Sequence, residues 1–298
     1  MKRETVSFCP ACESPRGAPA FTAPDVHGTA RYSDERFPVA RCGDCGAYYL
    51  SSRPTAEDLW RFYPSAYYGI EGPEPLLLKW FYRWSGAVKA GWVRPWVQRG
   101  TWLDVGCGSG RFLMGLDPSR WERVGLEPNE RGGGMIQEAS IKMVRRTLDE
   151  ADLAPGSVDV VSCWHVLEHV AHPRAMLAAA AKILKHDGVL ICAVPNTSSW
   201  GFRWFREHWF HGDAPRHLVQ YDRHSLHRLL TSCGFIPCGW RAQAYELPLD
   251  LWHSASSRWP ILRTPLVAPF AIFLTLTVKF FERWAGATET LTVIAKKT

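Results

Sequence analysis

The stretch that most constrains the fold is Leu103-Asp104-Val105-Gly106-Cys107-Gly108-Ser109-Gly110. The apolar run from Thr101 to Val105 is typical of a short buried strand, and it leads into glycines at alternate positions. The residues from Arg111 to Met114 then begin a helical pattern. A strand, a tight glycine turn and a helix N-terminus let a ligand come very close to the backbone, because no side chains block its approach. We therefore expect an α/β domain with a ligand site at this turn.

Two acidic residues indicate which ligand binds there. Glu127 ends the next apolar run, about 20 residues further on, where its carboxylate can accept hydrogen bonds from two ribose hydroxyls. Asp104 precedes the first glycine, so the pattern is D-x-G-x-G-x-G rather than the G-x-G-x-x-G that places a pyrophosphate on a helix N-terminus. A carboxylate at that position suits a cationic amino-acid group and not a phosphate.

These motifs resemble those of the class I S-adenosylmethionine (SAM) methyltransferases over roughly residues 100–298. The resemblance continues in register through the strand Val158–Cys163, the turn Trp164–Val170 and the strand Gly188–Asn196. It implies a Rossmann-like seven-stranded sheet with SAM as cofactor, and strands over 235–244 and 290–295 that complete the sheet.

The resemblance also implies roles for individual residues. The loop of Asp104, Gly106, Gly108 and Gly110 would pack against the methionine part of SAM, and Glu127 would bind its ribose. The loop before the fourth strand touches the adenine in this family, through either Leu148 or Asp149. Trp164 leaves that strand at its carboxyl end, where ligands sit in open α/β sheets, and is a further cofactor-binding candidate.

Three histidines are candidates for the base that removes the acceptor's proton: His165, His211 and His217. We expect His165 and His169 to lie one helical turn apart on one face, near Glu168. These three residues could form a base set, provide part of a metal site, or simply order the helix. His211 and His217 lie in a long segment, 196–221, that has no regular pattern of its own and is expected to wall the acceptor.

The N-terminal cysteines predict a metal site. Cys9 and Cys12, and Cys42 and Cys45, form two C-x-x-C knuckles that fit a structural Zn2+ ion in a zinc ribbon, with a β-hairpin over 13–41 between them. A redox pair is the rival interpretation, but two such motifs without a βαβ context make it weak. Similar knuckles precede the methyltransferase domain in some sugar C-methyltransferases.

We divide the chain into a zinc ribbon (1–52), a helical linker or cap (53–99) and a SAM-binding domain (100–298) with an apolar insertion (247–286). In the linker, residues 76–97 are expected to be helical, and Tyr63, Tyr67 and Tyr68 either cover the cofactor or pack on the core. Helical structure is also expected over 129–139.

The insertion contains a 13-residue apolar run, 266–278, which is too short to cross a bilayer. Tryptophans and basic residues flank it, and the stretch 259–284 therefore suits a helix lying on a membrane surface. A buried helix or a dimer contact is the alternative. The sequence leaves the oligomeric state open.

The charge and the N-terminus limit the function classes. The net charge of +6 comes from 35 basic and 29 acidic residues that are scattered along the chain, which disfavours a nucleic-acid partner. Residues 1–5 are not followed by an apolar segment, so we expect no signal peptide and a cytoplasmic location, at the inner face of the membrane if the insertion binds lipid.

The sequence thus predicts methyl transfer to a small-molecule, glycan or lipid-linked acceptor, on oxygen, nitrogen or carbon. A catalytically inactive SAM-binding or zinc-ribbon interaction module and a tRNA methyltransferase are the alternatives.

Overall fold

The computed structural model describes residues 1–298 except 26–34, 64–75, 130–139 and 243–248. The expectations for Tyr67, Tyr68 and the helix over 129–139 concern residues outside the described ones.

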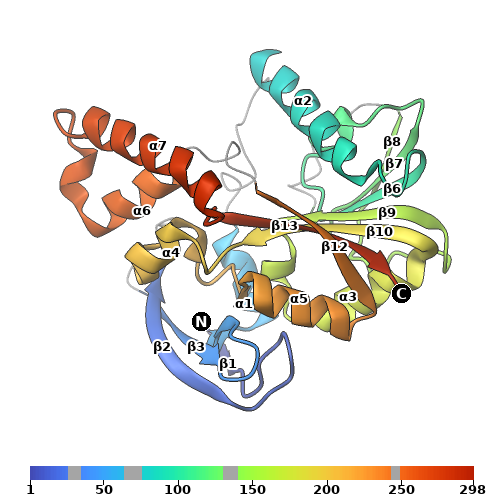
Figure 1. Cartoon of the computed structure of the whole chain (residues 1–298). Helices are drawn as coiled ribbons and strands as arrows, with labels where there is room; N and C mark the ends of the chain where they lie inside the picture. The colour runs from blue at the N-terminus through green and yellow to red at the C-terminus, as the bar shows by residue number, and fades with distance from the viewer. Residues whose placement is uncertain (26–34, 64–75, 130–139, 243–248) are drawn as a thin grey trace.

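The centre of the molecule is a seven-stranded sheet with the order β12-β13-β10-β9-β6-β7-β8 (Figure 1). Its strands are β6 (Gly100–Val105), β7 (Trp121–Leu126), β8 (Ile141–Val144), β9 (Val158–Trp164), β10 (Leu184–Pro195), β12 (Phe235–Ala242) and β13 (Thr290–Lys297). The five strands from β8 to β10 are parallel, and β13 is antiparallel to both of its neighbours. This confirms the predicted Rossmann-like sheet.

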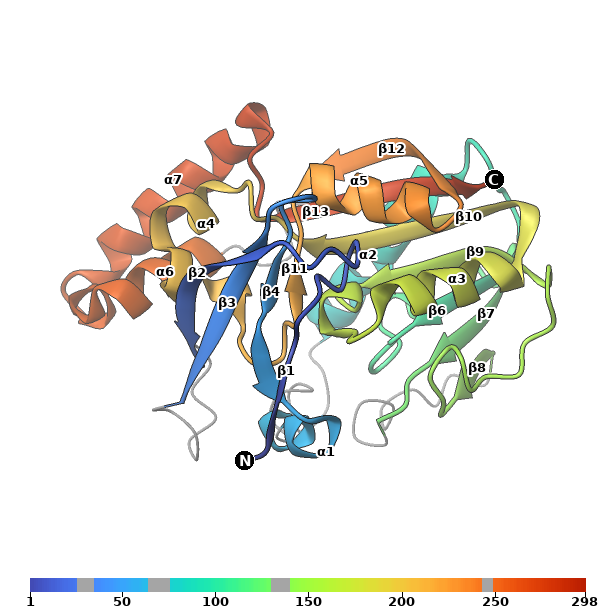
Figure 2. The ribbon, with the colours of Figure 1, turned by 90° about the horizontal axis from the view of Figure 1, so that it is seen from below.

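Helices cover both faces of the sheet, which explains the nearly continuous apolar runs in its central strands. Helix α2 (Leu76–Val93) lies on one face, and α3 (Pro173–Ile183) and α5 (Arg223–Ser232) lie on the other (Figure 1; Figure 2). Alternate residues of a strand serve the two faces: Val160 and Ile191 pack in the α2 layer, whereas Val161 and Leu190 pack in the opposite layer.

The helix expected directly after the glycine turn is wrong. The chain makes a single 3-10 turn there, η3 (Leu113–Gly115), and Leu116 is already extended. Pro118 disfavours helical backbone at the residue before it. Helix α2 also packs directly on the turn, since a Cβ at Gly115 would lie 2.6 Å from Gly86 Cα.

The N-terminal module contains β1 (Arg3–Thr5), β2 (Gly17–Pro24), β3 (Arg36–Cys42), β4 (Tyr48–Leu50) and β5 (Ser52–Pro54). The predicted hairpin is confirmed as β2 and β3. The strand β11 (Val219–Gln220) comes from the core domain and pairs with β4 at the edge of the four-stranded sheet β11-β4-β3-β2, as Figure 2 shows, whereas β1 and β5 form a separate pair. The module and the core domain therefore share a sheet and a continuous hydrophobic core.

Further elements lie in the linker, the insertion and the segment 196–221. In the linker they are α1 (Ala56–Leu59) and η1 (Trp60–Phe62), and in the insertion α6 (Asp250–Arg258), η7 (Pro260–Arg263) and α7 (Ala268–Ala285). The segment 196–221 is more regular than expected, because it contains α4 (Trp200–Phe205), η5 (Arg206–His208) and η6 (Phe210–Gly212). Ser199 caps α4 by accepting a hydrogen bond from Phe202 N at 3.1 Å.

Candidate functional site

The glycine turn after β6 is built for close approach. Gly106, Gly108 and Gly110 have φ of +65°, +52° and +69°, which L side chains rarely adopt. A Cβ at Gly106 would lie 2.6 Å from Val166 Cγ2, so this glycine lets the turn pack on the segment after β9. A Cβ at Gly108 would meet nothing within 4 Å. Gly108 therefore faces space that a ligand can occupy.

The carboxylate of Glu127 lies across this turn. Its Oε2 accepts a hydrogen bond from Gly108 N at 3.0 Å, and its Oε1 accepts one from Asn129 N at 3.0 Å. A carboxylate has about four lone-pair sites, so each oxygen can accept a further hydrogen bond. Glu127 is thus positioned beside the open space at Gly108 with acceptor capacity for a pair of hydroxyls.

Asp104 is buried at the end of β6. Its Oδ1 accepts a hydrogen bond from the Ser162 hydroxyl at 2.5 Å, and that hydroxyl accepts one from Trp102 Nε1 at 2.9 Å. Burial raises the pKa of Asp104 to about 7, although the Ser162 hydrogen bond and the charge of Lys89 act in the opposite direction. The positive charge near the carboxylate therefore does not offset the effect of burial, and the ammonium group of a ligand would add positive charge beside it.

The other predicted cofactor residues differ in their surroundings. The Trp164 ring packs against Phe112, with ring centroids 5.0 Å apart, and its Nε1 is buried without a hydrogen-bond partner among the described residues. Leu148 is buried in the core, whereas Asp149 is exposed. The open face of Gly108 and the Glu127 acceptors together fit the methionine and ribose groups of SAM.

The segment after β9 brings together one group of polar residues. It forms a 3-10 turn, η4 (Leu167–His169), and His165 has φ of +56°. The expectation that His165 and His169 share one helix face is therefore wrong. The reason is that α3 begins only at Pro173, which suits a helix start. His165 is 29% exposed at its side chain, and its Nδ1 lies 3.2 Å from Glu168 Oε1.

His217 joins this group from the segment 196–221. The His169 and His217 rings meet edge to face, with centroids 4.5 Å apart. Burial lowers the pKa of both His169 and His217 to about 4, so both rings are neutral at pH 7. The structure thus brings His165 and His217 to one cluster with Glu168 and His169.

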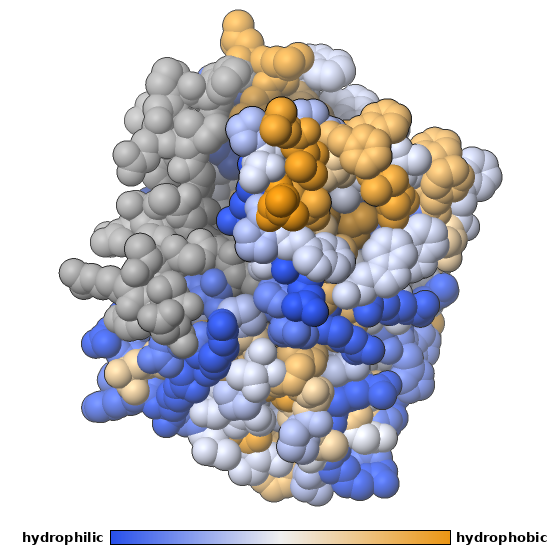
Figure 3. Space-filling model, turned by 90° about the vertical axis from the view of Figure 1, so that its left-hand side faces the viewer, coloured by the Kyte–Doolittle hydropathy of each residue, from blue (hydrophilic) through white to orange (hydrophobic). Residues whose placement is uncertain are grey.

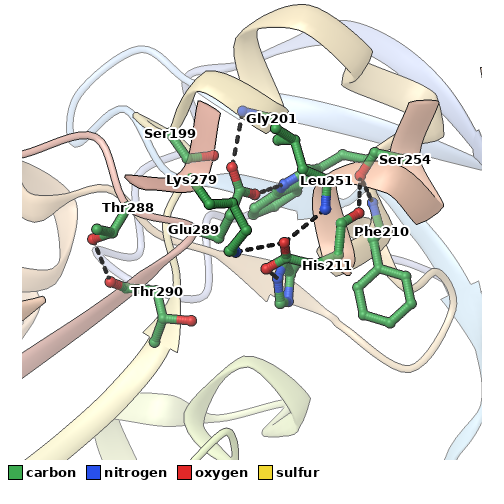
Figure 4. Close-up of polar contacts among 12 residues, drawn as sticks. Ser199, Gly201, Phe210, His211, Leu251, Ser254, Lys279, Thr288, Glu289 and Thr290 are labelled. Atoms are coloured by element: carbon green, nitrogen blue, oxygen red, sulfur yellow. Dashed lines mark hydrogen bonds and ion pairs between the residues drawn. The ribbon is translucent and has the colours of Figure 1, made fainter. Parts of the chain in front are cut away.

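The side chain of His211 belongs to a different buried network (Figure 4). His211 Nε2 lies 3.0 Å from Asp250 Oδ2, and Asp250 Oδ1 accepts a hydrogen bond from Lys279 Nζ at 2.5 Å. Nearby, Glu289 accepts hydrogen bonds from Gly201 N, at 2.9 Å, and from Trp209 Nε1. These contacts fasten α6 and α7 to the segment 196–221 and to the start of β13.

Asp250, Lys279 and Glu289 were not singled out from the sequence. Lys279 carried a usable signal, because it directly follows the apolar run 266–278 and a charge needs a partner when it is buried. A second buried acid, Glu282, lies beside Glu289, and burial together with the Glu289 charge raises its pKa to about 9.

The four predicted metal ligands come together. The Sγ atoms of Cys9 and Cys45 are 3.6 Å apart, those of Cys12 and Cys42 are 3.5 Å apart, and all four lie within 4.8 Å of one another. A tetrahedral site with metal–sulfur bonds of about 2.3 Å has sulfur–sulfur edges of about 3.8 Å. Asp44 N also points to Cys42 Sγ at 3.4 Å. This geometry fits a Zn2+ ion held by four thiolates.

The insertion exposes an apolar surface. Phe270 and Phe273 of α7 are each 70% exposed and Trp284 is 80% exposed. Figure 3 shows apolar side chains gathered over the upper part of this side of the molecule, above a mainly hydrophilic lower part. Figure 1 shows α6 and α7 projecting from the end of the sheet at which β13 begins. None of the helices among the described residues is both long enough and apolar enough to span a membrane.

Comparisons with known proteins agree with this geometry. A family model described as a methyltransferase domain matches residues 81–236, just over half of the chain. The ubiquinone biosynthesis O-methyltransferase of Photobacterium profundum is 32% identical over 104 residues, which cover 33% of this chain and 44% of that protein. The protein of the same name from Erwinia tasmaniensis is 34% identical over 110 residues, which cover 33% and 43%. The chain spans less than half the length of these curated relatives.

One solved structure supports the fold. It is described as a complex between the Haloferax volcanii Trm112 methyltransferase activator and the putative methyltransferase, and it matches with a TM-score of 0.51 at 17% identity, covering 82% of this chain and 97% of that one. The predicted resemblance is therefore confirmed, and the chain belongs to the methyltransferase domain family of class I SAM-dependent methyltransferases.

Proposed function

We propose that this chain transfers the methyl group of SAM to an oxygen atom of a small, lipid-soluble acceptor at a membrane surface. The observation that carries the acceptor class is the exposed apolar surface of α7. This surface lies near the carboxyl edge of the parallel strands, where ligands bind in open α/β sheets. Thr290, just after α7, pairs with Pro195 at the carboxyl end of β10. The curated relatives named as ubiquinone biosynthesis O-methyltransferases support an apolar acceptor and transfer to oxygen.

In this proposal SAM lies over the glycine turn. Asp104 is the counter-charge for its ammonium group, the three glycines admit its methionine part, and Glu127 accepts hydrogen bonds from its ribose. Trp164 Nε1 donates to a cofactor acceptor, and the adenine lies near Leu148 and Asp149. SAM supplies the chemistry, because its sulfonium makes the methyl group electrophilic.

His165 is the proposed base. When its Nδ1 donates to Glu168 Oε1, its Nε2 carries the lone pair that can accept the acceptor's proton. The acceptor oxygen then forms a bond to the methyl carbon as the carbon–sulfur bond breaks, and the electron pair stays on sulfur. Much of the rate comes from holding the oxygen in line with the methyl group. His211 already contacts Asp250, and His217 Nδ1 lies 2.8 Å from the His211 carbonyl oxygen, so we assign neither of them as the base.

The other parts have supporting roles in the proposal. Residues 1–52 form a module that a structural Zn2+ on Cys9, Cys12, Cys42 and Cys45 stabilises, residues 53–99 link it to the domain, and 100–298 carry out the reaction. The α7 surface docks on lipid through its phenylalanines. Arg258, Arg263 and Arg283 are exposed in the insertion and favour anionic headgroups.

The test is an acceptor screen that detects S-adenosylhomocysteine. A hydroxylated, prenylated aromatic compound in anionic vesicles, a lipid-linked glycan in the same vesicles, and tRNA without vesicles are each offered with SAM. The proposal predicts turnover with the prenylated aromatic compound, with an increase when vesicles are present. Turnover only with the glycan or with tRNA would contradict it.

A further inference from the structure

One cluster of possible ligand atoms lies apart from the four cysteines. Glu168, His169 and His217 each offer one atom, and these three atoms lie within 4.8 Å of one another. Glu168 and His169 come from the turn after β9, whereas His217 comes from the segment 196–221. The fold thus joins residues 48 or 49 positions apart in the chain, which gives the cluster a defined geometry.

We propose that Glu168, His169 and His217 bind a divalent metal ion that coordinates an oxygen of the methyl acceptor. The role of the acceptor oxygen as a metal ligand rests on the proposed function, whereas the metal site itself is supported by separate contacts.

The two histidines are held in the tautomer that a metal ligand needs. His169 Nδ1 lies 3.1 Å from the Arg216 carbonyl oxygen, and His217 Nδ1 lies 2.8 Å from the His211 carbonyl oxygen. The Tyr63 hydroxyl also lies 3.0 Å from His169 Nδ1, and a hydroxyl can accept as well as donate. A carbonyl oxygen only accepts hydrogen bonds, so each Nδ1 carries the proton and each Nε2 carries a lone pair. Metal-binding histidines are oriented in this way, by donating their second nitrogen to a carbonyl or a carboxylate.

The carboxylate provides the second, independent observation. Glu168 is fully buried, its Oε1 faces His165, and its Oε2 has no hydrogen-bond partner among the described residues. A buried carboxylate oxygen without a partner is costly. Two imidazole lone pairs and this oxygen are all acceptors, so they repel one another unless a cation lies between them.

A second carboxylate, Asp213, lies beside the cluster and is paired with the buried Arg216 guanidinium, which also pairs with Asp25. Asp213 Oδ2 lies 3.7 Å from His217 Nε2, while Asp213 Oδ1 accepts hydrogen bonds from Arg216. The same Arg216 supplies the carbonyl that orients His169. The region around the cluster therefore holds both the ligands and the groups that orient them.

Two imidazoles and one carboxylate suit Zn2+, Fe2+, Co2+ or Mn2+ and leave coordination positions for water or substrate. An ion there would lower the pKa of a coordinated acceptor hydroxyl, as it does for bound water. The proton released would pass to His165, which already contacts Glu168. The site also lies at the edge of the sheet that carries the glycine turn, because Trp164 ends β9 just before it.

The test uses Mn2+ as the probe on the full-length protein loaded with one Zn2+ per chain, which fills the four-thiolate site and leaves the second site free. Mn2+ prefers oxygen and nitrogen ligands, and four thiolates prefer zinc, so added Mn2+ reports on the second site alone. Electron paramagnetic resonance titration without SAM or acceptor is expected to show one bound Mn2+ per chain. Glu168→Gln and His217→Gln should each weaken Mn2+ binding at least about tenfold. The exposed His186→Gln is the control and should bind as the parent does.

The parent titration decides the question even if a buried substitution prevents folding. No Mn2+ uptake by the zinc-loaded parent, or equal affinity in folded Glu168→Gln and His217→Gln proteins, would overturn the site. Zinc content and SAM binding of each variant show whether it is folded. The titration contains no acceptor, so its result does not depend on the proposed function. A protein that binds Mn2+ but transfers no methyl group in the acceptor screen would contradict only the proposed function.

Discussion

Replacing Asp104 by asparagine should make the free protein more stable and its SAM binding weaker. Asparagine keeps the shape of the side chain and an oxygen that can accept the hydrogen bond from Ser162. What it removes is the negative charge. The substitution therefore separates the energetic cost of burying this carboxylate from its benefit to the ligand.

The size of the effect follows from the pKa. Burial raises the pKa of Asp104 in the folded protein to about 7 from an ordinary 3.8, so folding favours the protonated acid. The stability that the protonated Asp104 contributes is fully present below about pH 4 and is lost as pH rises through 7. At about 1.4 kcal/mol per pKa unit, the charged form costs about 4 kcal/mol above pH 7. The loss of a charge-assisted hydrogen bond to the ammonium is worth about 1.5–3 kcal/mol, or roughly 10- to 150-fold in SAM affinity.

The assays are thermal unfolding at pH 8 and pH 5, and calorimetric titration with SAM. Asp104→Asn should melt several degrees higher than the parent at pH 8, and the difference should shrink toward pH 5. The SAM affinity of the parent should fall about tenfold per pH unit below 7, because the acid must first lose its proton. The exposed Asp187→Asn should change neither property. A variant that is no more stable at pH 8, or that binds SAM as tightly as the parent, would refute the reasoning.

Three further substitutions test separate parts of the proposal. Glu127→Gln should weaken SAM binding by roughly 10- to 100-fold, because the new amide nitrogen cannot accept the hydrogen bonds of the ribose and the turn. The exposed Glu122→Gln, on the strand that precedes Glu127, is the calorimetric control, and equal losses in both would contradict the assignment. Cys42→Ser should reduce the zinc content from one ion per chain and destabilise the N-terminal module. The exposed Cys238→Ser should change neither the zinc content nor the stability. An unchanged zinc content of Cys42→Ser, measured by mass spectrometry, would exclude the four-thiolate site. The double substitution Phe270→Ser with Phe273→Ser should lower partition into anionic vesicles at least about tenfold, measured by sedimentation with the vesicles. Phe8 is exposed on the N-terminal module, and Phe8→Ser should leave the partition unchanged. Equal partition of the parent and both variants would contradict the membrane-docking role of α7.

The sheet was predictable because its signals are local. The glycines after β6, the apolar runs of β9 and β10, and the acid that directly follows β7 each occupy a short window of sequence. A short window also fixes the start of α5, since Asp222 accepts a hydrogen bond from Ser225 N at 2.7 Å in a capping box. The expected helix after the glycine turn is wrong because Pro118 and the packing of α2 decided that segment, and the pattern of Arg111 to Met114 did not.

The candidate site was only partly predictable because its partners are distant in the chain. His211 meets Asp250 across 39 residues, and Gly201 meets Glu289 across 88. The turn after β9 separates His165 from His169 and turns His169 toward His217, which periodicity could not show. By contrast, the four cysteines were predictable, because each C-x-x-C knuckle already fixes half of its metal site.

The most direct measurement is calorimetric titration of the zinc-loaded protein with SAM and, separately, with NAD. The acid–glycine turn and Glu127 predict one SAM site per chain with a Kd on the order of micromolar, and no heat with NAD. Binding of NAD in place of SAM, or no binding of SAM, would contradict the central claim that this turn holds the methyl donor.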